Sequence, residues 1–135
     1  VAMRTAVIAA VVMLASPAVA NDCQVVNRER RCTFISGHFE TVTWSDMRGN
    51  VQRMTMKTPD TGRDAAGWLA LMGLNMQALV PNGTREQRAE LLRNLMQSMT
   101  NRTGQSFRHG AYSWTGVWTP DKAMTIGAER VRPSR

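Results

Sequence analysis

The chain has 135 residues, of which 43% are hydrophobic and 20% are charged, with 10 Gly, 5 Pro and 2 Cys. This composition excludes a disordered chain, a collagen-like repeat, a coiled coil and a miniprotein held together by disulfides. The formal net charge of +7 favours partners that carry negative charge.

The first 20 residues have the pattern of a secretory signal peptide. Arg4 precedes an apolar run over residues 6–14, and Ala18 and Ala20 supply the small side chains that signal peptidase requires. The run is shorter than the ~20 residues of a bilayer span, which argues against a membrane anchor. We therefore expect cleavage after Ala20, a single α+β domain over residues 21–135, and a periplasmic or secreted location in a bacterial envelope.

Two cysteines, Cys23 and Cys32, lie near the start of the exported chain. In an oxidising compartment this pair predicts a disulfide rather than a metal site. If the cysteines pair directly across a hairpin, residues 27–28 form a two-residue turn. A redox-active pair is the alternative, but such pairs favour Cys-x-x-Cys at the start of a helix.

Residues 31–57 alternate between apolar and polar side chains, as antiparallel strands do. We expect strands over 31–35, 40–44 and 51–57, with a turn at 45–50. In the last strand the alternation places Gln52, Met54 and Met56 on one face, and Val51 and Arg53 on the other.

A first helix is expected over residues 64–80, which are apolar nearly all round. This pattern is typical of a helix buried on most sides, so we expect four side chains to be almost inaccessible: Trp68, Leu71, Met72 and Leu79. Gly67 and Gly73 would let neighbouring backbone approach closely. The alternative is that one apolar face stays open as a docking groove for a partner or lipid.

A second helix is expected to begin at residue 84, where Thr84 and Gln87 have the spacing of a capping box, and to stop near Gly104. Residues 105–118 and 123–131 then predict a closing hairpin around a type I turn at 119–122. The order of strands, two helices and strands indicates an α+β fold, in which an antiparallel sheet packs against a central two-helix hairpin.

Arginine supplies 15 of the 17 basic side chains. Removal of residues 1–20 takes away Arg4 and no acid, which leaves 16 basic and 10 acidic residues, a net charge of +6. Codon bias is one explanation, and a surface for anionic partners is the functional one. For the latter, the arginines near residue 30 and the aromatic closing hairpin suggest these binding residues: Arg28, Arg30, Arg31, Tyr112, Trp118 and Lys122.

The two histidines, His38 and His109, suggest a metal-independent ribonuclease as an alternative. One imidazole would take a proton from the 2′-hydroxyl, the other would protonate the leaving oxygen, and arginine would stabilise the phosphorane. Glu40 would orient His38 or act as the base. These residue types are common, and no nuclease motif accompanies them.

Methionine is frequent, with 10 residues, and thioethers bind Cu(I). The methionine pairs fall on expected core faces, however, where this side chain fills irregular space. We therefore expect no metal and no cofactor. No triad, phosphate loop or paired-carboxylate pattern marks a catalytic site.

The closing hairpin resembles the end of the periplasmic inhibitors of C-type lysozyme, through Gly110-Ala-Tyr112-Ser-x-x-Gly116-x-Trp118-x-x-x-Lys122-Ala-x-Thr. The resemblance implies a lysozyme partner, with Lys122 in place of the family's lysine and Ser106 nearest to its serine. The family's Lys-Gly pair is absent, and its all-β barrel has no counterpart of residues 64–102.

Together these patterns predict a small exported binding protein with a basic surface and no catalytic site. Its partner would be a protein or an anionic component of the envelope, since no nucleic-acid motif is present. A lysozyme-inhibitor-like protein and a secreted ribonuclease remain the alternatives.

Overall fold

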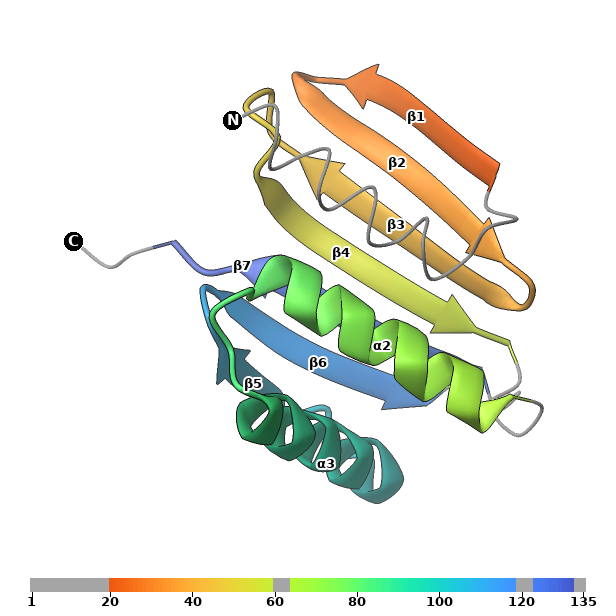
Figure 1. Ribbon diagram of the computed structural model, residues 1–135, viewed down its shortest axis with the longest axis vertical. Helices are drawn as coiled ribbons and strands as arrows, with labels where there is room; N and C mark the ends of the chain where they lie inside the picture. Colours follow the sequence, from red (N-terminus) through yellow and green to blue (C-terminus); the bar gives the residue numbers. More distant parts are fainter. Residues whose placement is uncertain (1–19, 60–63, 119–122, 133–135) are drawn as a thin grey trace.

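The computed structural model describes residues 20–59, 64–118 and 123–132. They form one antiparallel sheet of seven strands with two helices on one face (Figure 1). The strands are β1 (Ala20–Val26), β2 (Glu29–Ser36), β3 (Phe39–Ser45), β4 (Val51–Thr58), β5 (Ser106–His109), β6 (Tyr112–Trp118) and β7 (Met124–Arg130), and the helices are α2 (Ala65–Leu79) and α3 (Arg85–Asn101). The predicted α+β class and the central helical hairpin are confirmed.

The sheet joins two meanders. Strands β1 to β4 are successive neighbours, and so are β5 to β7, while β4 pairs with β7 to give the order β1-β2-β3-β4-β7-β6-β5. α3 packs on β5 and β6, and α2 lies beside it and reaches β4. No helix in the described part of the chain is long and apolar enough to cross a membrane.

The predicted disulfide is present in the β1–β2 hairpin. Cys23 and Cys32 lie directly opposite each other in the ladder and are bonded. Asn27 and Arg28 form the expected two-residue turn, with φ of 54° and 63°. Both angles lie in the left-handed region that a type I′ turn requires, so Arg28 adopts a conformation usually left to Gly or Asn.

A β-bulge interrupts the pairing of β3 with β4. The alternation of apolar and polar residues in the sequence did not reveal it. Trp44 pairs with Arg53, but the next residue, Ser45, pairs with Val51, so Gln52 is the extra residue. Val51 therefore enters the core, and the prediction that it shares a face with Arg53 is wrong. The two methionines that follow keep their expected inward side.

Both helices begin at caps that the sequence supplies. At the start of α2, the side chain of Asp64 accepts a hydrogen bond from the amide of Gly67. Thr84 and Gln87 form the predicted capping box of α3, since the backbone amide of each donates to the other's side chain. α3 ends before the expected glycine because Arg102 adopts the left-handed conformation, with φ of 55°.

α2 is covered less completely than its apolar sequence predicted. Trp68, Leu71 and Met72 are buried as expected, but Leu79 is only half-buried. The opposite side of the helix is exposed, and three of its five exposed residues are alanines. The five are Ala65, Ala66, Leu69, Ala70 and Gln77. A small-residue face exposes little apolar area per residue, so it tolerates solvent without polar side chains.

The expectation that neighbouring backbone approaches the glycines of α2 is wrong at Gly73. A Cβ placed on Gly73 would meet nothing within 4 Å. The nearest atoms to a Cβ on Gly67 belong to the capping side chain of Asp64.

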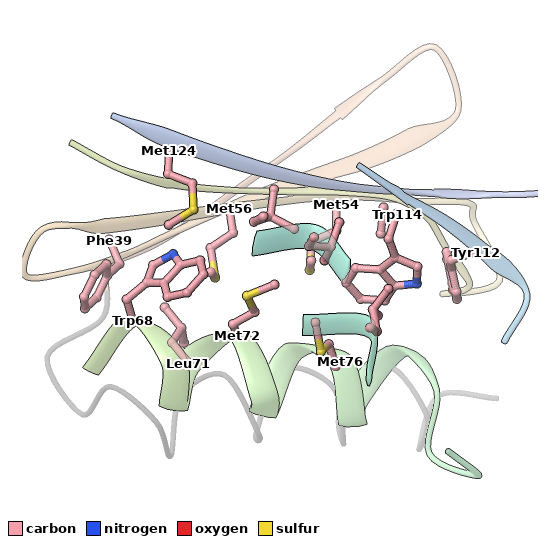
Figure 2. Close-up of a cluster of buried hydrophobic side chains, with 14 of the residues drawn as sticks. Phe39, Met54, Met56, Trp68, Leu71, Met72, Met76, Tyr112, Trp114 and Met124 are labelled. Atoms are coloured by element: carbon pink, nitrogen blue, oxygen red, sulfur yellow. The ribbon is translucent and has the colours of Figure 1, made fainter. Parts of the chain in front are cut away.

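Methionine and aromatic side chains from α2 and the sheet point toward each other and fill the space between the two layers (Figure 2). Trp114 is 0% exposed, and Tyr112 packs against it edge-on with ring centroids 6.4 Å apart. The methionines fill this core as expected: Met54, Met56, Met72, Met76, Met99 and Met124 are all buried.

The predicted closing strand over residues 105–118 is two strands. Gly110, with φ of 63°, and Ala111 form a turn that separates β5 from β6. Alternation continues on both sides of this turn, which is why the sequence pattern did not show the break. β6 and β7 form the predicted hairpin, while its turn at 119–122 lies outside the described residues.

Candidate functional site

Several turns lie together at one end of the sheet, on the left of Figure 1. The β1–β2, β3–β4 and β5–β6 turns share this end because the strands are antiparallel, and β7 finishes there. The α2–α3 loop lies at the same end. Its Val80 packs against Gly110 of the β5–β6 turn so closely that a Cβ on that glycine would clash with the Val80 methyl groups.

This end collects arginines that lie far apart in the sequence. We call it the arginine end and define it by five exposed side chains: Arg28, Arg30, Arg48, Arg130 and Arg132. The first two come from the first hairpin, the third from the β3–β4 turn, and the last two from the end of β7. β2 and β7 are three strand spacings apart, so the charges extend over roughly 15 Å.

Two acids near this end, Asp46 and Glu29, have contacts of their own. Asp46 holds the β3–β4 turn by accepting hydrogen bonds from the backbone amides of Arg48 and Asn50, at 2.9 Å each. Slight burial opposes its ionisation, but the hydrogen bonds from Asn50 and Arg48 and the positive charge of Arg48 outweigh burial and lower the pKa of Asp46. Glu29 pairs with Arg53 at 3.3 Å. No arginine of the arginine end forms an ion pair with a carboxylate of the described residues.

Trp44 lies between two guanidinium groups on the sheet face away from the helices. The guanidinium carbons of Arg31 and Arg53 are 5.8 and 4.6 Å from the ring centroid, within cation–π range. Arg31, one of the candidate binding residues, therefore contacts Trp44 on the sheet face opposite to that of its neighbour Arg30.

The candidate aromatic residues of the closing hairpin have structural roles. The hydroxyl of Tyr112 is buried and donates a hydrogen bond to the carbonyl oxygen of Val51 at 2.8 Å. Burial raises the pKa of Tyr112, and the charge and hydrogen bond of Arg130 oppose the rise. Trp118 is half-buried against the core, and Lys122 lies outside the described residues.

The structure does not bring the two histidines together. His38 lies in the β2–β3 turn at the opposite end of the sheet, where it lines a pocket with Glu40 and Lys57. His109 ends β5, which is four strand spacings of about 4.8 Å from β3. An acid and a base that act on one phosphodiester must both reach it, so these side chains do not assemble the ribonuclease site considered above.

A groove runs between α3 and the edge strand β5, and one of its ends lies at the arginine end. We call it the α3–β5 groove. It encloses about 520 Å³, which is within the usual range of ligand sites. One wall is built from α3 by Gln87, Glu90, Leu91 and Asn94, and the other from β5 by Phe107, Arg108 and His109.

His109 is buried at the end of the groove that the α2–α3 loop closes. Its side chain is 8% exposed, and Nε2 has no hydrogen-bond partner among the described residues. Burial, together with the positive charge of Arg88, lowers the pKa of His109, which favours the neutral imidazole. Arg88 in turn donates a hydrogen bond to the carbonyl oxygen of Gly83 at 2.8 Å, which fixes the loop.

Sequence reasoning missed the α3–β5 groove. Gln87, Leu91 and Asn94 recur at helical spacing, which shows that they share a face of α3. The strand opposite them went unrecognised because residues 105–118 appeared to be one strand. Within the described ranges, no three His, Cys, Asp or Glu side chains are grouped as they would be in a metal site.

The lysozyme-inhibitor resemblance does not extend to the fold. The described strands form an open sheet with two edges, β1 and β5, not a barrel. Ser106, the nearest counterpart of that family's serine, shares a hydrogen bond with the Thr115 hydroxyl at 2.7 Å. Comparisons with protein-family models, curated proteins and solved structures find no match for this chain.

Proposed function

We propose that this chain is an exported binding protein, without a catalytic site of its own, whose arginine end docks on an anionic component of the bacterial envelope. One observation carries the proposal: five exposed arginines from three separate parts of the chain converge on one end of the sheet. The signal-peptide pattern and the disulfide between Cys23 and Cys32 support export, because disulfides persist in oxidising compartments.

The spread of these arginines favours an extended partner over a single small anion. Exposed ion pairs contribute about 0–1 kcal/mol each, so useful affinity requires several simultaneous contacts. Guanidinium groups bind carboxylates and phosphates through paired hydrogen bonds, and both groups are abundant on acidic polymers and lipid headgroups. Binding of this kind weakens as salt screens the charges.

The ribonuclease and lysozyme-inhibitor alternatives gain no support from the described residues. His38 and His109 lie at different ends of the sheet. The fold differs from that of the inhibitor family. The structure therefore offers no observation that favours either activity over binding.

The proposal is tested with two anionic probes, vesicles containing phosphatidylglycerol and poly-L-glutamate. The protein should bind at least one of them at low salt and release it at high salt. The double variant Arg48→Gln/Arg132→Gln should bind several-fold more weakly. The double variant Lys57→Gln/Arg93→Gln removes the same charge from exposed sites outside the arginine end and should bind like the parent.

Two results would contradict the proposal. One is a failure of both probes to bind at low salt. The other is an equal loss of binding in the two double variants, since this would mean that net charge acts without the geometry of the arginine end.

A further inference from the structure

The α3–β5 groove lies along the free edge of the sheet. Phe107 and His109 point toward the helices, because each pairs with an inward-facing residue of β6, whereas Arg108 between them points to the other face. A groove that touches all three consecutive residues must run beside the strand rather than over one of its faces. Among the described strands, β5 has β6 as its neighbour on one side and none on the other.

The backbone of β5 leaves hydrogen-bonding groups along this edge. His109 and Tyr112 flank the two-residue turn and pair with each other. In an antiparallel ladder, successive residues direct their N–H and C=O groups alternately toward and away from the partner strand. The N–H and C=O groups of Arg108 and Ser106 therefore point away from β6, toward the groove side of the sheet.

α3 runs alongside this edge and provides the opposite wall of the groove. It packs on both β5 and β6, and Gln87, Leu91 and Asn94 from one side of the helix line the groove. The result is a slot with a strand edge on one side and a helix on the other. An extended chain placed in such a slot can hydrogen-bond to the strand while its side chains contact the helix.

We propose that the α3–β5 groove binds an extended peptide segment of a partner protein, which adds to β5 as an eighth strand of the sheet. This site goes beyond the proposed function and does not depend on it, because none of the five arginines that define the arginine end lines the groove. If the arginine end binds no anionic surface, the groove still binds the peptide.

The residues that line the groove also determine which types of side chain the bound peptide carries. Residues of an added strand alternate between the two faces of the sheet. Those facing α3 meet Leu91 and Phe107, which favour apolar side chains, and the amides of Gln87 and Asn94 on the same wall offer hydrogen bonds beside them. Those on the other face lie beside Arg108, so they are acidic, while Glu90 on α3 repels acids from the helix side. The ligand is thus a peptide in which apolar and acidic residues alternate.

The probe is the capped hexapeptide acetyl-Val-Glu-Val-Glu-Val-Glu-amide, titrated into isotopically labelled protein and followed by NMR. We expect amide shifts concentrated at Ser106, Arg108 and Asn94, and slower hydrogen exchange at the amide of Arg108. A peptide of the same composition with the valines and glutamates in separate blocks should bind at least tenfold more weakly. So should a hexapeptide N-methylated at alternate residues, since it cannot donate to the strand edge.

Variants of α3 test the position of the site. Asn94→Trp should fill the groove from the helix side and weaken binding of the alternating peptide at least tenfold. Gln97→Trp, one turn further along the same helix at an exposed position outside the groove, should bind like the parent. Thermal unfolding of both variants checks that each one folds, and the N-methylated peptide gives an answer without any variant.

Several results would overturn the inference. They are no binding of the alternating peptide at millimolar concentration, equal binding of the block peptide, or shifts that map to the arginine end instead of β5. The last two would indicate that charge alone attracts the peptide, which would leave the proposed function standing and remove the groove as a peptide site.

Discussion

Gly83 lies against the imidazole of His109, so that a Cβ placed on the glycine would stand 3.0 Å from Cε1 and 3.1 Å from Nε2. A side chain at residue 83 would therefore require the imidazole or the α2–α3 loop to shift by a few tenths of an ångström. His109 is 8% exposed, and this burial is the main cause of its lowered pKa, with the charge of Arg88 as the second cause.

Gly83→Ala should destabilise the protein by about 1–3 kcal/mol, the usual cost of forcing extra volume into a packed site. Chemical denaturation measures the change. The matched control is Gly73→Ala, because a Cβ there meets nothing within 4 Å. That substitution should stabilise the protein by about 0.5–1 kcal/mol through helix propensity. Destabilisation of similar size in both variants would contradict this account of the loop.

The pH dependence of stability should carry the signature of His109. Its folded-state pKa lies below the ordinary value of 6.5, so the unfolded chain binds this proton more readily than the folded chain does. Stability is therefore fully present above about pH 6.5 and declines as the pH falls below that value, until the folded-state pKa is reached.

Denaturation of the parent and of His109→Gln from pH 8 to pH 5 tests this expectation. Carboxylate titrations are common to both proteins, so the difference between the two curves isolates His109. The free energy of unfolding should fall more steeply with acid in the parent than in the variant. Parallel curves would show that the histidine titrates as it does in water.

The disulfide should contribute about 2–3 kcal/mol, since Cys23 and Cys32 close a short loop. Cys32→Ser should therefore lower the free energy of unfolding by that amount without abolishing folding. Mass spectrometry of protein isolated from the periplasm should find a chain that begins at Asn21 and weighs two hydrogens less than its reduced form. A chain with free thiols, or one that retains residues 1–20, would contradict the export proposal.

The sequence predicted those features of the fold that depend on contacts between residues close together in the chain. The turn at Asn27 and Arg28, the capping box at Thr84 and the Cys23 pairing each depend on residues a few positions apart, and each was predicted. The bulge that carries Val51 inward depends on the register of two strands, which alternation within a single strand does not report.

The candidate sites required tertiary information. Arg28 and Arg132 belong to opposite ends of the chain, and only the β4–β7 pairing brings them to one end of the sheet. The α3–β5 groove needed the break at Gly110, because β5 exists as a separate edge strand beyond β6 only when the chain turns there. Residue types alone suggested an anionic partner, but they did not reveal which surface would bind it.

α2 offers a test of which side of an apolar helix stabilises the fold. Leu71 faces the sheet and is 6% exposed, whereas Leu69, two positions earlier, is 40% exposed on the outer side. Leu71→Ala should cost about 2–5 kcal/mol, the range for a core leucine. Leu69→Ala should stay within about 0.5 kcal/mol of the parent, as surface substitutions usually do.

The same pair of variants decides whether the outer side of α2 is a docking groove, the alternative that its apolar sequence raised. An apolar fluorescent probe should bind the native protein weakly, because the exposed face is mostly alanine. Strong probe binding that Leu69→Ala abolishes, together with normal stability of Leu71→Ala, would show that this face holds a ligand and that the helix does not anchor the core. A stable Leu69→Ala and a destabilised Leu71→Ala would instead place the stabilising contacts of α2 on the sheet side, where Trp68 and Met72 are buried with Leu71.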